Sequence, residues 1–302
     1  MERTIITEKT RTNTGEGREP SIRRRSLAQE VCLQIVLALG GVAIVAPFLY
    51  MLSTSLKTQG QWVIAPMAWI PNPITVENYI NAFRAVNVFL LAKNSLIIVV
   101  FSLVGQVLSC AAVAYPLARL RFPGRQFVFV LVIATLMLPP QVLLIPQYLI
   151  FNRLGWVDTF RPFIVPSYFG LNAFFVFLLR QFFRTIPREL DEAVLLDGGS
   201  YFTIFWRVVL PLAKPALVTV AIFHVAGTYN DFFGPLVYLH SWEKYTMTIG
   251  IVLLGALINP NLPAVPIQTA GAVLMIVPLV VFYFLVQEQF TRGIQLSGML
   301  KG

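Results

Sequence analysis

A polar segment interrupts this otherwise apolar chain at residues 189–215, which read ELDEAVLLDGGSYFTIFWRVVLPLAKP. Pro187 suits the first turn of a helix, where its missing N–H costs no hydrogen bond. Glu189, Asp191 and Glu192 follow within the same turn, where the helix dipole favours negative charge. These residues predict a short amphipathic helix, and the chemistry that such a helix serves is the docking of a partner.

One face of this helix is mostly apolar, and its members recur at positions i, i+3, i+4 and i+7: Leu190, Ala193, Val194 and Asp197. A helix with such a face docks into a groove of another protein and transmits force through a rigid element. Gly198 and Gly199 are expected to end the helix because glycine tolerates the left-handed conformation of a C-terminal cap. Ser200 is the candidate cap of a second, aromatic helix over residues 201–209, and Pro211 then redirects the chain.

Groups that catalyse reactions are scarce. The chain has two histidines, His224 and His240, and no H-E-x-x-H motif, nucleophile–base set or metal-ligand cluster. It also lacks a G-x-x-x-x-G-K-[ST] phosphate loop, so ATP hydrolysis requires another polypeptide. Cys32 and Cys110 fall in apolar stretches and are expected to pack as small apolar residues. We therefore expect no metal site and no cofactor bound by this chain, and a membrane enzyme is disfavoured.

The composition is that of an integral membrane protein. Hydrophobic residues make up 57% of the chain and charged residues 12%, whereas soluble domains carry about 25% charged residues. The mean hydropathy is +0.72. A helix needs about 20 apolar residues to cross about 30 Å of hydrocarbon. The sequence predicts an all-α membrane protein with about six transmembrane helices, near residues 31–52, 94–116, 127–150, 162–182, 215–237 and 265–287.

The remaining segments divide the chain further. The predicted order is a disordered cytosolic tail, a first span with an external segment, a core with its cytosolic loop at 184–214, and a cytosolic tail: residues 1–30, 31–89, 90–288 and 289–302. A short surface helix is predicted over 75–89. Residues 245–258 are apolar but too short to cross, which indicates an interfacial or re-entrant element. Pro139-Pro140 in the third span is the candidate flexing point.

The net charge of +9 is distributed unevenly. Arginines and lysines concentrate before the first span, in the loop after the second, around the loop after the fourth and after the last span. Because Lys/Arg bias sets membrane orientation, both termini and the 184–214 loop are expected on the cytosolic side. No nucleic-acid-binding motif accompanies the basic residues, so topology explains their excess.

The polar loop resembles the EAA motif of membrane subunits in bacterial ABC importers. The matching residues are Glu192, Ala193, Asp197, Gly198 and Leu210-Pro211, while Val194 and Gly199 stand where alanine is commoner. The resemblance implies an ABC importer type I permease fold whose cytosolic coupling helices receive the stroke of a separate ATPase dimer. ATP and Mg are then ligands of that partner, and the chain is expected in a bacterial or archaeal cell membrane.

Three further segments look like the carbohydrate-type group of these permeases: residues 137–157, residues 229–236 with Tyr229 in place of tryptophan, and the tail 290–302. The likeness to MalG-like chains of MalF/MalG-type pairs implies a second, non-identical MalF-like permease subunit. It also implies an external solute-binding protein that delivers a sugar, with a di- or oligosaccharide as the leading expectation. The tail is expected to contact the ATPase through Gly293, Gly298, Lys301 and Gly302.

Five polar residues in or near the spans are candidates for the translocation path: Asn230, Asp231, His224, Asn172 and Gln268. A carboxylate is costly in hydrocarbon, so Asp231 should face a cavity, a partner or water, and structural pairing is the alternative to sugar contact. For His224 the alternative is a packed, hydrogen-bonded histidine. Residues 255–263 occupy the place where maltose-type permeases reach into the binding protein. This position singles out Gly255, Asn259, Pro260 and Asn261, with surface packing as the alternative.

Two other transport functions remain open. An ABC permease for a glycerol phosphodiester or a polyol carries the same coupling loop. An ion-coupled secondary transporter generally uses intramembrane carboxylates and inverted repeats, whereas Asp231 stands nearly alone and no convincing repeat is present. The leading interpretation is the permease subunit of an ATP-driven, binding-protein-dependent sugar importer, which forms half of the translocation path.

Overall fold

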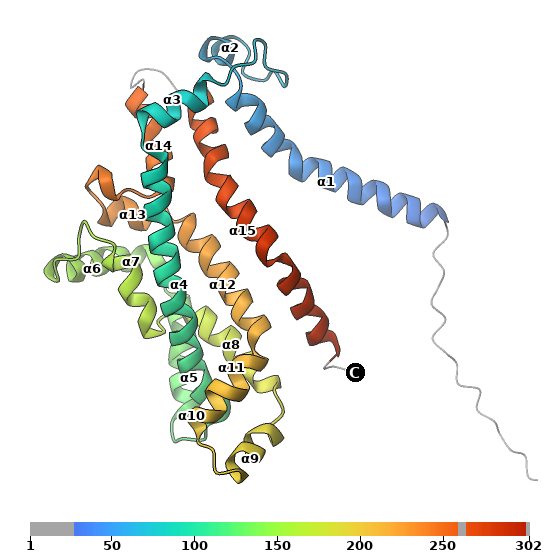
Figure 1. The fold of residues 1–302 in the computed structure, drawn as a ribbon, viewed down its shortest axis with the longest axis vertical. Helices are drawn as coiled ribbons and strands as arrows, with labels where there is room; N and C mark the ends of the chain where they lie inside the picture. Colours follow the sequence, from blue (N-terminus) through green and yellow to red (C-terminus); the bar gives the residue numbers. More distant parts are fainter. Residues whose placement is uncertain (1–26, 259–263, 300–302) are drawn as a thin grey trace, which may run out of the picture. The chain divides into compact units, whose positions relative to one another are not determined.

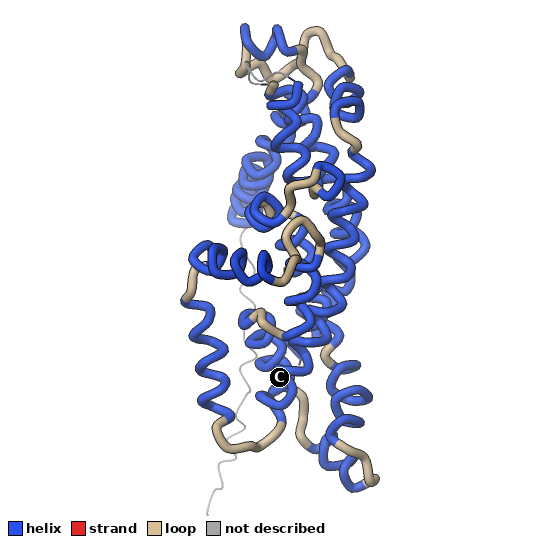
Figure 2. The backbone as a smooth tube through the Cα atoms, turned by 90° about the vertical axis from the view of Figure 1, so that its left-hand side faces the viewer, coloured by secondary structure: helices blue, strands red, loops and turns tan. Residues whose placement is uncertain are grey.

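The computed structural model describes residues 27–258 and 264–299. This part of the chain is helical, and Figure 2 shows helices and loops without a strand. The α-helices are α1 (Leu27–Ser55), α2 (Gln59–Ile64), α3 (Glu77–Ala85), α4 (Val88–Arg119), α5 (Arg125–Ala134), α6 (Pro140–Arg153), α7 (Arg161–Ile164), α8 (Ala173–Thr185), α9 (Glu189–Leu196), α10 (Tyr201–Ile204), α11 (Leu210–Leu212), α12 (Lys214–Tyr229), α13 (Phe233–Tyr238), α14 (Met247–Ile258) and α15 (Val265–Met299). Shorter turns are η1 (Thr135–Met137), η2 (Val165–Phe169), η4 (Trp242–Lys244) and the π-helical turn η3 (Phe205–Val209).

Four stretches in the described residues are long and apolar enough to cross a membrane: Gln29–Ser55, Val88–Arg119, Arg161–Thr185 and Val265–Leu285. Two further pairs of helices qualify together but are bent, by 100° between Arg125–Met137 and Pro140–Arg153 and by 74° between Tyr201–Leu212 and Lys214–Tyr229. The described residues therefore contain four candidate spans, or up to six if each bent pair is one span. The prediction of an all-α membrane protein with about six spans is confirmed.

The predicted third span, 127–150, is not one continuous helix. Pro139 has an extended backbone (φ −60°, ψ 129°), and Pro140 begins α6. A residue before proline is pushed out of the helical region, and proline fits the first position of a new helix. The proline pair therefore produces a break between α5 and α6. Its role as a flexing point stays a prediction.

The predicted fifth span, 215–237, is also shorter than expected. The helix α12 ends at Tyr229, and α13 is a separate helix that begins at Phe233. Pro235 has no N–H to donate to the carbonyl four residues earlier, which disfavours a continuous helix. The carboxylate Oδ1 of Asp231 accepts a hydrogen bond from the N–H of Gly234 (3.2 Å) and so stabilises the start of α13.

The chain divides into two compact units, residues 1–49 and 50–302. The described part of the first unit is most of α1, whose large apolar side chains are exposed on every side, for example Leu37 at 65% and Ile44 at 70%. A helix that is apolar all round is typical of a membrane span. The domain boundaries predicted at residues 30, 89 and 288 stay predictions.

In the second unit, α4 is the central helix. It packs against α8, η2, α12 and α14. Figure 1 shows α9 and α10 near one end of α4, and α3 and α14 near the other. The main buried cluster joins α4 and α8 to the segment from α10 to α12, and Ala111, Ala114, Leu179 and Phe183 are fully buried in it. Small residues on α4 allow this close approach of helix backbones.

At the far end of α4, the chain forms two short helices, α3 and α14. The helix α3 lies within the predicted range 75–89, and its Ala82 is fully buried. The helix α14 corresponds to the apolar run 245–258 and packs against α3, α4 and α15. Its residues Ile249 and Leu254 are buried, so this short run is part of the protein core.

Candidate functional site

The predicted docking helix is α9. It begins at Glu189 after the N-cap residue Arg188, so Pro187 lies before the helix and not in its first turn as predicted. Gly198 has a φ of +80°, the left-handed conformation that favours glycine at the end of a helix. Of the two predicted capping glycines, Gly198 alone adopts it, while the N–H of Gly199 donates to the carbonyl of Val194 (2.8 Å).

At position 199, glycine is required because of packing and not because of its backbone conformation. A Cβ atom at this position would lie 2.5 Å from Cγ1 and 2.8 Å from the carbonyl oxygen of Val194. Both distances are shorter than real contacts between such atoms, so the tight turn after α9 leaves room for hydrogen alone. Val194 and Gly199, the two departures from the EAA pattern, are therefore in contact with each other.

Ser200 caps the second helix as predicted. Its hydroxyl accepts from the N–H of Thr203 (3.3 Å), and the Thr203 hydroxyl accepts from the N–H of Ser200 (3.4 Å). The predicted helix over 201–209 consists of α10 followed by the π-helical turn η3. Reciprocal capping satisfies two N–H groups that a helix start otherwise leaves without partners.

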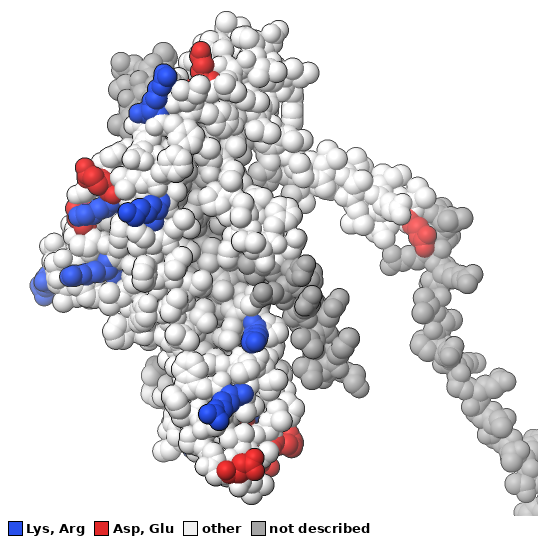
Figure 3. All heavy atoms as spheres, viewed as in Figure 1, with Lys and Arg blue, Asp and Glu red and all other residues white. Residues whose placement is uncertain are grey.

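The predicted coupling residues are divided between the core and the surface. Val194 and Leu210 pack against the main buried cluster, whereas Glu192, Ala193, Asp197 and Pro211 are exposed. The largest exposed apolar side chain of α9 is Leu196, at 88%. In Figure 3, acidic side chains gather at the end of the molecule where Figure 1 places α9. The exposed surface of α9 therefore combines acidic side chains with the exposed apolar side chain of Leu196.

A buried arginine fixes α9 to the end of α4. Arg119 Nη2 lies 2.7 Å from Asp191 Oδ1, and the two side chains are 2% and 17% exposed. The same guanidinium donates to the carbonyls of Ile186 (2.6 Å), Pro187 (3.0 Å) and Phe183 (3.3 Å). A planar guanidinium with five N–H groups is suited to several acceptors at once. The sequence pattern does not predict these contacts, because the partners of Arg119 lie 64 to 72 positions away in the chain.

The second candidate site is a cavity of about 710 Å³ lined by residues of α4, α6, α7, α8, α12 and α13 and of the segments next to them. Small-molecule sites have volumes of about 300–1,000 Å³. Pro140, Leu144, Gln147 and Phe151 line it at i, i+4, i+7 and i+11 of α6, which is one helix face. The 100° bend between α5 and α6 turns this face of α6 toward the cavity.

Three of the five predicted path residues line this cavity. Asn172 caps α8, where its Oδ1 accepts from the N–H of Phe175 (3.2 Å). His224 is buried and its Nε2 lies 2.8 Å from the Ser102 hydroxyl, so it is both a packed histidine and a lining residue. Asp231 is half-buried, and its Oδ1 accepts a hydrogen bond from the N–H of Gly234 near the start of α13.

The other two predicted path residues lie elsewhere. The Asn230 amide donates to the carbonyl of Ala226 (2.8 Å), and Asn230 does not line the cavity. Gln268 packs against Gly255, where an added Cβ would meet its Nε2 at 2.1 Å. Gly255 therefore lies inside α14 and not in the predicted loop, because the apolar helix continues to Ile258.

Asn259, Pro260 and Asn261 of the predicted binding-protein loop, and Lys301 and Gly302 of the tail, lie outside the described residues. Gly293 and Gly298 fall within α15, which continues to Met299. Their predicted contacts with a binding protein and an ATPase stay predictions.

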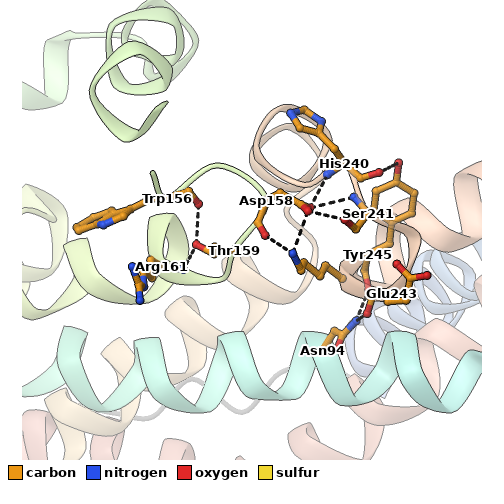
Figure 4. Close-up of polar contacts among 10 residues, drawn as sticks. Asn94, Trp156, Asp158, Thr159, Arg161, His240, Ser241, Glu243 and Tyr245 are labelled. Carbon is orange, nitrogen blue, oxygen red and sulfur yellow. Dashed lines mark hydrogen bonds and ion pairs between the residues drawn. The ribbon is translucent and has the colours of Figure 1, made fainter. Parts of the chain in front are cut away.

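Asp158 joins two loops that flank the cavity (Figure 4). Its carboxylate accepts from the Ser241 hydroxyl, from the N–H groups of Ser241 (2.9 Å) and His240 (3.0 Å), and from Lys244 Nζ (2.9 Å). The Ser241 hydroxyl contributes most, and together these donors hold the pKa of the Asp158 carboxyl well below its usual range. Asn94 of α4 holds the second loop by donating to the carbonyls of Glu243 (2.8 Å) and Tyr245 (3.0 Å).

The profile of a family described as the binding-protein-dependent transport system inner membrane component matches residues 108–296, which is more than half of the chain. The chain belongs to this family. Members are membrane subunits of ABC importers, so this permease is a transport component and not an enzyme. Membership also implies a separate ATPase and a solute-binding protein as partners.

Relatives match this permease over most of their length. The protein LplC of Bacillus subtilis is 31% identical over 88% of this chain and 93% of its own. The arabinooligosaccharides transport system permease protein AraQ of Halalkalibacterium halodurans is 33% identical over 76% and 81% of the two chains. The diacetylchitobiose uptake system permease protein NgcG of Streptomyces coelicolor is 33% identical over 72% and 71%.

A solved structure supports the fold. It is the crystal structure of a bacterial ABC transporter involved in the import of the acidic polysaccharide alginate. The match has a TM-score of 0.72 and covers 88% of this permease and 99% of that chain, at 24% identity. The permease fold predicted from the EAA-like loop is therefore confirmed.

Proposed function

We propose that this permease forms half of the translocation path of an ATP-driven importer for a sugar, with a di- or oligosaccharide as its cargo. The cavity carries this proposal. Amide side chains and aromatic rings line it together, and these groups bind hydroxyls and the apolar faces of sugar rings. The names of the relatives AraQ and NgcG, which refer to arabinooligosaccharides and diacetylchitobiose, support the same class of cargo.

Coupling to ATP hydrolysis is assigned to α9 and α10. The helix α9 presents an exposed surface, while Val194 and the Arg119–Asp191 ion pair attach it to the core. A rigid helix held in this way transmits displacement to α4 and α8. The chain has no phosphate loop, so ATP and Mg bind to the partner ATPase and no cofactor binds to this chain.

The Lys/Arg distribution supports an orientation with α9 and both termini in the cytosol. The C-terminal end of α14 and the loops joined by Asp158 then belong to the opposite side, where a binding protein delivers the sugar. The second permease subunit is expected to be non-identical and MalF-like, and it supplies the other half of the path.

Uptake in the native host tests the function. Cells with and without this gene are given monosaccharides, disaccharides, oligosaccharides, polyols and glycerol phosphodiesters, and a plasmid copy restores the deleted gene as control. Loss of uptake of one di- or oligosaccharide on deletion is the expected result. Loss of a polyol or phosphodiester, with sugar uptake unchanged, would overturn the sugar assignment and leave the coupling assignment in place.

A further inference from the structure

Two glutamines on the cavity wall have unused hydrogen-bonding groups. Gln141 and Gln147 of α6 are both exposed to the cavity side, and neither makes a hydrogen bond within the described part of the chain. A primary amide offers two donors and one acceptor oxygen, so it can bind a hydroxyl as donor or as acceptor. Both amides are therefore available to a polar ligand without breaking an internal contact.

Aromatic rings supply the apolar part of the same wall. The ring of Tyr238 (α13) contacts the rings of Phe151 (α6) and Phe163 (α7), at centroid distances of 5.4 and 5.8 Å. Phe223 and Phe233 are exposed and line the cavity as well. Fixed aromatic faces beside free amides match a ligand that has both an apolar face and hydroxyl groups.

The charges of the lining residues disfavour sugars that carry an acidic group. Among the described residues that line the cavity, none is a lysine or an arginine. Asp231 is their one carboxylate, and His224 is buried against Ser102. An anionic ligand would find no cation among these residues and would face the like charge of Asp231.

From these three observations we infer that this chain itself contacts the sugar, and that its cavity selects neutral glycosyl units against units that carry a carboxylate or sulfonate. The inference rests on the proposed function, since it concerns the cargo of the same path. Gln141 and Gln147 bind hydroxyls, the aromatic rings pack against the sugar ring, and Asp231 opposes anions.

Direct binding to the assembled permease–ATPase complex, without its binding protein, tests the inference. Equilibrium dialysis at millimolar concentrations compares cellobiose, xylobiose and arabinobiose with cellobiouronic acid, glucuronosyl-xylose and digalacturonic acid. We expect at least one neutral disaccharide to bind about tenfold or more tightly than every acidic one. Gln147→Ala should weaken that binding several-fold. Gln126→Ala, which removes an exposed glutamine of α5 that does not line the cavity, should leave it unchanged.

A charge added to the wall separates ligand contact from a structural role. Gln147→Arg should raise the ratio of acidic to neutral disaccharide bound, whereas damage to the fold lowers both together. The inference is overturned if no neutral disaccharide binds, if acidic and neutral disaccharides bind equally, or if Gln147→Arg leaves the ratio unchanged. Uptake by the complete transporter with its binding protein is measured in parallel, because absence of any sugar uptake there would refute the proposed function instead.

Discussion

Removal of the Arg119 side chain should detach α9 from the membrane core and uncouple transport from ATP hydrolysis. This guanidinium makes four hydrogen bonds across the base of the coupling loop, to Asp191 and to the carbonyls of Phe183, Ile186 and Pro187. In Arg119→Ala, these four acceptors lose one common donor, and the carboxylate loses its counter-ion.

The expected size of the effect follows from burial. Removing one partner of a buried ion pair costs about 3–5 kcal/mol because the remaining charge is left uncompensated. The Asp191 side chain is 17% exposed and regains some water, so the lower end, about 3 kcal/mol, applies. A free-energy difference of this size corresponds to roughly a hundredfold change in the ratio of attached to detached α9.

The assay compares sugar transported per ATP hydrolysed in proteoliposomes that contain the complete transporter. We expect Arg119→Ala to lower this ratio by at least about tenfold, while basal ATP hydrolysis continues. Arg119→Lys keeps the charge but cannot reach four acceptors with one ammonium group, so it should be intermediate. Arg121→Ala is the matched control, because it removes an exposed arginine two residues away that makes no hydrogen bond within the described chain.

The double variant Arg119→Ala/Asp191→Ala separates the ion pair from the carbonyl contacts. It should transport better than Arg119→Ala, since no uncompensated carboxylate remains. Normal coupling in Arg119→Ala, with the complex fully assembled, would refute the view that this arginine holds the coupling loop. An equal loss in Arg121→Ala would assign the effect to net charge instead.

Three further predictions concern the turn after α9 and the Asp158 cluster. Gly198→Val should destabilise the complex by about 1–2 kcal/mol, because β-branched residues resist a positive φ. Gly198→Asn should cost less stability. Equal melting temperatures for the two variants would contradict this. Gly199→Ala should cost about 1–3 kcal/mol through its clash with Val194, and Val194→Ala should recover part of that loss when combined with it, as a thermal double-mutant cycle can measure. Asp158 has a folded-state pKa below its usual value, so its stabilising contribution is present above about pH 4 and is lost as pH falls through the folded-state pKa. Asp158→Asn should therefore flatten the acid side of the stability profile, whereas Glu243→Gln should keep it, and an unchanged profile in Asp158→Asn would count against this cause.

The class of protein and the local shape of the coupling loop follow from the sequence, because they depend on neighbouring residues. The lengths of the apolar runs predict the spans, and the Ser200 cap and the left-handed Gly198 depend on contacts a few residues apart. The spacing of residues in the EAA-like loop also indicates the protein family. None of these features requires knowledge of how distant segments meet.

The tertiary structure alone decided which side chains act together. Arg119 and Asp191 are 72 positions apart, and Asp158 and Ser241 are 83 apart. The bend at Pro139-Pro140 has a local cause, but its angle of 100° depends on what α6 packs against. Residues of the translocation path were therefore predicted from the polarity of their side chains alone. The structure places Asn172, His224 and Asp231 at the cavity, and Asn230 and Gln268 elsewhere. The cavity glutamines carried no signal in the sequence, because an amide on an apolar helix becomes a binding group only when packing turns it toward a shared space.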